Sequence, residues 1–237
     1  MTAAPAWALV LVACALFAPA AAAGSAIAPE QELVVLLGGH EVRSRPDVGG
    51  AATGSIGPRR PITHARTVLP VLDRRVDDDA RGWLRVRLPG RTLGRRSPPR
   101  SGWIRSNETR RATTRWHIVV DVGARGIRVY RSGRLIRRFA AIVGKPSTPT
   151  PRGRYFVEEN VRLDATHAGA PFALATSARS RVLQEFAGGP GQIALHGLQN
   201  IGGRPGTAIS HGCVRLRTAD VTWLAARIAP GIPVTIV

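Results

Sequence analysis

The first half of the chain alternates short apolar runs with turns. Between residues 32 and 106, the turns are rich in Gly, Pro and Asp. The apolar runs are residues 33–37, 42–44, 68–72, 83–88 and 102–104. Strands this short, separated by turn-forming residues, predict a small all-β barrel.

From Trp116 onward, apolar and polar residues alternate with a period of two, which is typical of half-buried β-strands. The predicted strands are residues 117–122, 127–131, 135–143, 155–157, 172–175, 192–195 and 233–237, with a turn at residues 132–133. One stretch differs, because Val221, Leu224, Ala225 and Ile228 share a face at helical spacing. Thr218 is the predicted N-cap of this helix. The second half is therefore expected to be mainly β with one short helix.

Two segments lie outside these patterns. Residues 107–114 are polar and unpatterned, so we expect a linker between domains at residues 32–106 and 115–237. Residues 1–23 are apolar, uncharged and end in small residues, as in a secretory signal peptide cleaved near Ala23. This leader predicts export to the cell wall or beyond. Two alternatives remain open: a retained membrane anchor, or a lipoprotein signal at residues 11–14 with Cys14 lipidated.

The formal net charge is +19, and almost all of the excess is arginine because Lys145 is the only lysine. The charge is spread about equally over both halves, whereas nucleic-acid-binding proteins more often concentrate it on one element. No nucleic-acid partner is therefore expected. A dispersed positive charge fits attraction to an anionic cell-wall polymer. The alternative is that arginine is simply the preferred cation of this genome.

Cys213 is the candidate nucleophile. Once residues 1–23 are removed it is the sole cysteine, so it has no partner for an internal disulfide. A free thiol is vulnerable in an oxidising compartment, so its presence there favours a chemical role. The alternatives are an inert buried cysteine and a Cys/His/His zinc site, although zinc sites usually show closer ligand spacing and a fourth ligand. Neither a metal nor an organic cofactor is expected.

A thiol with a pKa of about 8.5 needs a base to react at neutral pH. His211, two residues before Cys213, is awkwardly placed to take its proton. His196 is the better base, because it ends the predicted strand 192–195 and the Gly-rich loop 197–209 can fold back to bring Cys213 beside it. No Asp or Glu separates His196 from Cys213, so the group that orients the imidazole is a backbone carbonyl or comes from elsewhere. Gly212 permits a tight backbone that suits N–H donors for an oxyanion hole.

These residues carry a family resemblance. Residues 210–216 read Ser-His-Gly-Cys-Val-Arg-Leu, follow His196-Gly197, and resemble the catalytic motif of the L,D-transpeptidase (YkuD) family. The Pro/Thr-rich residues 144–153 are similar to a turn of that family, so the likeness covers about residues 115–237. It implies a YkuD-like β-sandwich with Cys213 as nucleophile and His196 as general base. It also implies structural, oxyanion or substrate-positioning roles for Ser210, His211, Gly212, Arg215 and Gly197.

A second resemblance concerns the first half. Residues 42–46, 82–90 and 102–104 resemble a bacterial SH3-like domain of the kind found in cell-wall enzymes. Trp83 and Trp103 are then either a platform for glycan or peptide, or core aromatics, and we favour core packing.

The first resemblance implies acyl transfer on peptidoglycan stem peptides. The Cys213 thiolate would attack the carbonyl before the terminal D-residue of a stem tetrapeptide, and an amine of a second stem would complete the cross-link. Two alternatives stay open: hydrolysis of the same bond by an L,D-carboxypeptidase, and a cell-wall-binding module without activity.

Overall fold

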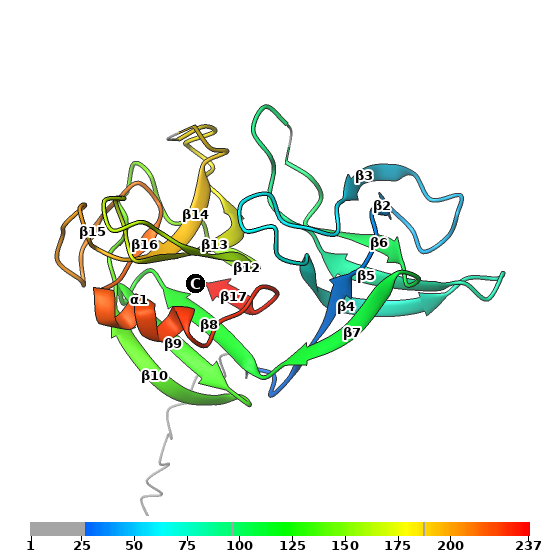
Figure 1. Cartoon of the computed structure of the whole chain (residues 1–237), viewed down its shortest axis with the longest axis horizontal. Helices are drawn as coiled ribbons and strands as arrows, with labels where there is room; N and C mark the ends of the chain where they lie inside the picture. The colour runs from blue at the N-terminus through cyan, green and yellow to red at the C-terminus, as the bar shows by residue number, and fades with distance from the viewer. Residues whose placement is uncertain (1–26, 96, 187) are drawn as a thin grey trace, which may run out of the picture.

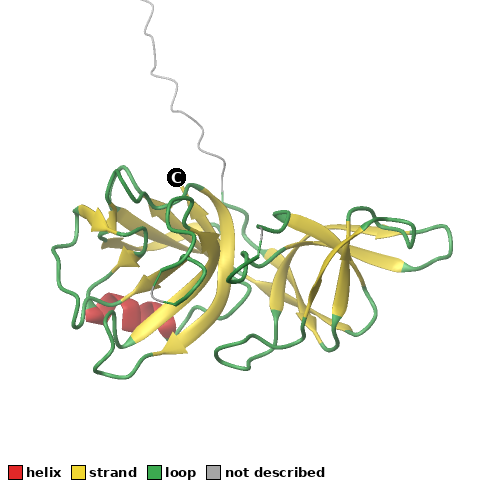
Figure 2. Cartoon of the chain, turned by 90° about the horizontal axis from the view of Figure 1, so that it is seen from above, coloured by secondary structure: helices red, strands yellow, loops and turns green. Residues whose placement is uncertain are grey.

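The computed structural model describes residues 27–95, 97–186 and 188–237. The predicted leader at residues 1–23, with Cys14, lies outside them. Two β-structures lie side by side, and a single short helix, α1 (Thr218–Ala225), belongs to the second (Figures 1 and 2). The predicted mainly β fold is confirmed. Within the described ranges, no helix has the length and apolar character needed to cross a membrane.

The N-terminal half is a curled seven-stranded antiparallel sheet in the order β3-β2-β6-β5-β4-β1-β7. The strands are β1 (Gln31–Leu36), β2 (His40–Arg43), β3 (Ala52–Ile56), β4 (Val68–Val76), β5 (Gly82–Arg87), β6 (Ser101–Arg105) and β7 (Thr109–Thr114). Trp83 is 1% exposed and its indole N–H donates to Asp77 Oδ2 at 2.9 Å, so it is a packing residue. Trp103 is partly exposed. The likeness to SH3-like domains stays a prediction.

The predicted linker is wrong for most of its length. Residues of β7 pair with β1 from Leu36↔Thr109 to Gln31↔Thr114, and only Arg115 separates β7 from β8 (Trp116–Asp121). β7 is the edge strand of its sheet and half of its side chains are exposed. Backbone hydrogen bonds to β1 hold this strand in the sheet. Its sequence therefore lacks the apolar alternation from which a strand is predicted.

The C-terminal half is an eight-stranded sheet in the order β10-β9-β8-β17-β12-β13-β14-β16, accompanied by a parallel pair of short strands. The remaining strands are β9 (Gly126–Arg131), β10 (Arg134–Ala140), β11 (Val143–Gly144), β12 (Gly153–Arg162), β13 (Phe172–Arg179), β14 (Gln192–His196), β15 (Ala208–Ser210), β16 (Val214–Arg215) and β17 (Pro233–Ile236). The short pair is β11 and β15.

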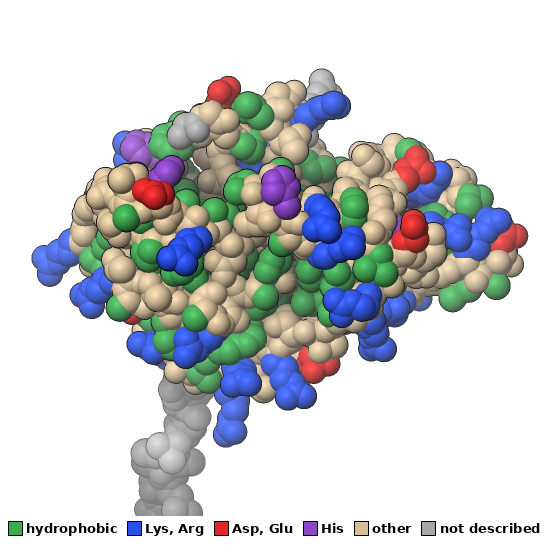
Figure 3. All heavy atoms as spheres, in the orientation of Figure 1, with side chains coloured by type: hydrophobic (Ala, Val, Ile, Leu, Met, Phe, Trp, Pro, Cys, Tyr) green, Lys and Arg blue, Asp and Glu red, His purple; other side chains and the backbone are tan. Residues whose placement is uncertain are grey.

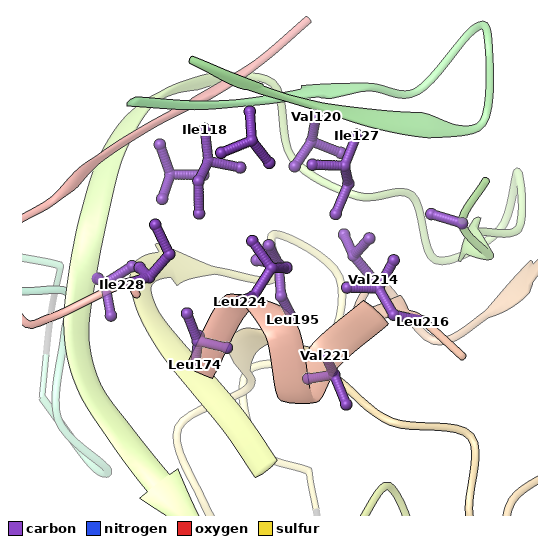
Figure 4. Packing of buried hydrophobic residues seen from close by; sticks show 14 of the residues in the cluster. Ile118, Val120, Ile127, Leu174, Leu195, Val214, Leu216, Val221, Leu224 and Ile228 are labelled. Carbon is purple, nitrogen blue, oxygen red and sulfur yellow. The ribbon is translucent and has the colours of Figure 1, made fainter. Parts of the chain in front are cut away.

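The helix packs its apolar face on the inside of this sheet. Leu224 of α1 belongs to the same buried cluster as Leu195 of β14, and both face a layer formed by Ile118, Val120 and Ile127 (Figure 4). All of these side chains are buried. The predicted cap is wrong, because Arg217 occupies the N-cap position without a side-chain cap and Thr218 is already helical.

Strand β12 serves both halves of the molecule. Phe156 is 1% exposed and joins the N-terminal core, whereas the next residue, Val157, lies in the C-terminal core. Successive side chains of a strand point to opposite faces, which allows one strand to fill two cores. The two halves are therefore packed together and not merely tethered.

Candidate active site

Strands β14 and β16 place the predicted catalytic residues on one face of the sheet. The two strands are parallel, with Leu195 opposite Val214 and His196 opposite Arg215. Leu195 and Val214 are fully buried, so the alternating residues His196, Cys213 and Arg215 point to the other side, where all three are partly exposed. The loop 197–209 thus returns the chain to β14, and Arg215 is the residue directly opposite His196.

A backbone carbonyl orients His196. Its Nδ1 lies 2.9 Å from the carbonyl oxygen of Gly197. A carbonyl only accepts, so Nδ1 carries the proton and Nε2 keeps its lone pair in the neutral ring. Burial lowers the pKa of His196; the Gly197 carbonyl opposes this and the charge of Arg215 adds to it. His196 is therefore neutral at physiological pH and able to accept a proton.

The loop before β13 approaches the same imidazole closely. The amide of Gly197 donates to the carbonyl of Gly169 at 2.8 Å, and a side chain at Gly169 would collide with His196 Nδ1. Gly169 has φ of +90°, which favours glycine. Sequence analysis missed this residue, because no local pattern reveals a contact between segments this far apart.

The thiol of Cys213 is protonated at rest. Its Sγ lies 3.7 Å from the carbonyl oxygen of Gln192. Burial raises the pKa of Cys213, while a hydrogen bond from the backbone of Ala194 and the charge of Arg215 lower it. Because burial is the largest of these effects, the resting nucleophile is a thiol that must lose its proton during attack.

Ser210 and Gly212 fix the turn in front of Cys213. Ser210 is fully buried; its Oγ accepts from the Gly212 amide at 3.1 Å and donates to the Cys213 carbonyl at 2.6 Å. Gly212 has φ of +120°, a conformation that side chains disfavour. The expectation that this glycine frees N–H donors fails for its own amide, which Ser210 already occupies.

The Pro/Thr-rich turn supports the motif from behind. Thr150 Oγ1 accepts from the Gly144 amide at 2.9 Å and donates to the Gly212 carbonyl at 2.8 Å. Thr148 Oγ1 donates to the Ser210 carbonyl at 3.2 Å. Both threonines are buried, so these bonds are shielded from water. Their role was hidden in the sequence because they lie about sixty residues from the motif.

His211 has different surroundings. Its ring is exposed and stacks on Phe186, with ring centroids 5.5 Å apart and planes at 26°. In an extended strand, residues two apart point to the same side, so the spacing of two residues does not by itself keep the His211 ring away from the Cys213 thiol. The positive φ of Gly212 between them breaks that extended geometry. The His211 ring is thus held by Phe186 at the edge of the site. This position suits contact with a substrate better than removal of the Cys213 proton.

Gln192 links the nucleophile to the junction between the two halves. Its backbone carbonyl faces Cys213 Sγ, and its side-chain amide donates to Glu158 Oε2 at 3.1 Å. Glu158 is 1% exposed and also binds Arg60 at 2.7 Å and Arg179 at 3.2 Å. Arg60 comes from the N-terminal half, so a buried ionic network reaches from that half to the strand beside Cys213.

The described parts of the chain contain no group of three or more His, Cys, Asp or Glu residues placed to hold a metal ion. The described histidines, His196 and His211 included, are therefore not arranged with Cys213 as a three-ligand site.

Known proteins are similar to this chain. Residues 115–236 match the L,D-transpeptidase catalytic domain, YkuD. The chain is 30% identical over 124 residues to the putative L,D-transpeptidase YkuD of Bacillus subtilis, covering 52% of this chain and 67% of that protein. It is 26% identical over 218 residues to L,D-transpeptidase 1 of Mycobacterium tuberculosis, covering 77% and 80%. A solved structure, the L,D-transpeptidase LdtMt1 in complex with imipenem, is 20% identical, covering 73% of this chain and 92% of that one with a TM-score of 0.44.

The matched region begins one residue before β8 and contains the whole face of β14 and β16. The chain therefore belongs to the L,D-transpeptidase family with a YkuD catalytic domain.

Proposed function

We propose that the protein is a cysteine-dependent transpeptidase of peptidoglycan, with Cys213 as nucleophile and His196 as general base. One observation supports it most strongly: a sole described thiol and an oriented, neutral imidazole lie on the same solvent-facing side of β14 and β16. Family membership supplies the substrate class, the stem tetrapeptide.

The first step is acylation. As Cys213 Sγ attacks the carbonyl before the terminal D-residue, its proton passes to Nε2 of His196. The tetrahedral intermediate collapses, the peptide C–N bond breaks, and Nε2–H protonates the departing D-amino acid. With the Gly212 amide already bonded to Ser210, we assign the oxyanion to the backbone amide of Cys213 itself.

The second step returns the enzyme to its resting state. The amine of another stem attacks the thioester and gives its proton to Nε2, and Sγ leaves as a thiolate that takes this proton back. Arg215 supports substrate positioning, because its buried Nε has no hydrogen-bond partner among the described residues and its charge acts on both Cys213 and His196. We assign it to a carboxylate of the stem peptide.

Incubation with a defined disaccharide-tetrapeptide, followed by mass spectrometry, tests this activity. A cross-linked dimer from the mature protein and none from Cys213→Ala is the expected result. Tripeptide without dimer would replace transfer by hydrolysis, as in an L,D-carboxypeptidase. Absence of both products, or equal products from Cys213→Ala, would reject the enzyme and leave a cell-wall-binding module.

The covalent intermediate has its own test. Imipenem, the compound present with the solved relative, is the acyl donor to use. Intact-mass analysis should show one adduct, and peptide mapping should place it on Cys213. An adduct on another residue contradicts the assignment of the nucleophile.

We further infer export through residues 1–23, in keeping with a substrate in the cell wall. N-terminal sequencing of the protein recovered from its host distinguishes the three forms. A start near residue 24 indicates signal cleavage, a lipidated Cys14 indicates a lipoprotein, and an intact leader indicates a membrane anchor.

A further inference from the structure

A second site lies at the junction of the two halves. Lysine and arginine side chains are dispersed over the surface of both halves in the face that Figure 3 shows. In one pocket of about 330 Å³, arginines gather from both halves. They are Arg87, Arg91 and Arg100 from the N-terminal half and Arg154, Arg179 and Arg181 from the C-terminal half. None of the described residues that line it is Asp or Glu.

Most of this charge is not neutralised. Of the six arginines, only Arg179 forms a salt bridge among the described residues, and its partner Glu158 lies outside the pocket lining. Arg91 is buried and donates to the carbonyls of Ser180, Leu183 and Gln184. Carbonyl partners fix its guanidinium without cancelling its charge.

The mutual repulsion is visible at Arg87. Burial lowers the pKa of Arg87, and the charges of Arg154 and Arg100 lower it further. One of its guanidinium nitrogens donates to the backbone carbonyl of Arg154 at 3.0 Å, so the group is also held in place. A cationic pocket with fixed donors and no carboxylate gains stability from a bound anion.

We propose that this pocket binds a phosphate group, free or within a phosphodiester polymer. Planar guanidinium groups donate paired hydrogen bonds to phosphate oxygens, and several of them around one pocket match a tetrahedral anion with more than one charge. Ser97 and Ser177 also line the pocket and provide hydroxyl groups. None of its lining residues belongs to the face that carries Cys213 and His196, so the site is separate from the catalytic one.

Titration of the mature protein with pyrophosphate by calorimetry tests the site. The test variant is R100Q/R154Q/R181Q, which changes exposed arginines without a salt bridge among the described residues. The control is R110Q/R134Q/R138Q, with the same change in net charge on exposed residues elsewhere. We expect wild type and control to bind alike and the test variant to bind at least about tenfold more weakly. No binding to the wild type, or equal weakening in both variants, overturns the proposal.

The source of the phosphate is resolved by comparing ligands with the same number of phosphates. A poly(glycerol phosphate) oligomer that binds more tightly than pyrophosphate identifies a polymer ligand, and equal affinities identify free phosphate. A DNA oligonucleotide that binds wild type and test variant equally well, and as tightly as the glycerol polymer, shows diffuse attraction and contradicts a built site. An unchanged midpoint of thermal unfolding shows that the test variant is folded, and this measurement does not depend on the proposed activity.

Discussion

The imidazole of His196 and the thiol of Cys213 are both uncharged at rest. Burial lowers the pKa of His196 and raises that of Cys213, so an ion pair is disfavoured from both sides. General-base catalysis fits such a pair, because the proton moves only as the sulfur attacks. Arg215 acts in opposite ways on the two: its charge stabilises a thiolate and disfavours an imidazolium.

Alkylation of Cys213 by iodoacetamide should therefore still accelerate above about pH 8.5, the ordinary pKa of a thiol. In Arg215→Gln the profile should move to still higher pH, because a charge that lowers the pKa of Cys213 is lost. Arg217→Gln, an exposed neighbour, is the control and should leave the profile in place. A profile centred at or below neutral pH would instead reveal a preformed thiolate–imidazolium pair.

The two histidines near Cys213 should differ in effect. His196→Gln should lower the rate of tetrapeptide turnover by about 10²- to 10⁴-fold, as expected for loss of a general base. His211→Gln should lose less, since its ring is exposed and packs on Phe186. Initial rates at saturating substrate decide the matter, and similar losses would show that the base is misassigned.

At the scale of residues, the sequence indicates the candidate nucleophile and base but not the contacts that position them. The 210–216 motif and His196 can be recognised in the sequence because a nucleophile and its base require particular residue types, and here these lie close together in the chain. A backbone carbonyl was one of two alternatives for the group that orients His196, because no acid lies between His196 and Cys213, and the structure places the carbonyl of Gly197 there. Thr148, Thr150 and Gly169 were not predictable, because their roles depend on the approach of distant segments. The Gly212 amide was expected to be free because its bond to Ser210 cannot be seen in sequence.

Among the elements, the turn at residues 144–150 and the motif loop form one hydrogen-bonded unit. Thr150→Val keeps the shape of the side chain but leaves the Gly144 amide and the Gly212 carbonyl without this partner. We expect a loss of about 1–3 kcal/mol in the free energy of unfolding for each buried group left unpaired. Urea denaturation measures it, with Thr222→Val on the exposed side of α1 as the control. If the urea midpoint of Thr150→Val equals that of the control, the hydrogen bonds of Thr150 do not stabilise this unit.

Elements with a buried face were predictable and polar edge elements were not. β14 was expected at residues 192–195 because they form an apolar run that leads up to His196, and the structure confirms a strand there. β3 and β7 were not predicted because β3 exposes most of its side chains and β7 exposes half of them. Their pairing depends on the neighbouring strand and not on their own composition.

In the molecule as a whole, the buried carboxylate of Glu158 connects the halves. Glu158→Gln should leave the nearly buried charge of Arg179 without its counter-ion, and leave Arg60 with only the longer contact to Glu159 at 3.9 Å. Loss of one partner of a buried ion pair costs about 3–5 kcal/mol, so thermal unfolding should shift strongly. Glu41→Gln removes an exposed salt bridge to Arg43 and should cost about 0–1 kcal/mol. Equal shifts would mean that the network adds nothing to the junction.

The connection between β7 and β8 has a mechanical consequence. Arg115 alone separates the two strands, and β12 fills both cores, so neither half can swing away without exposing buried side chains. A polymer bound in the arginine-lined pocket at the junction would thus lie at a set distance from Cys213. Inserting a few glycines at residue 115 would loosen this fixed spacing between the junction and Cys213, even with every catalytic group left intact.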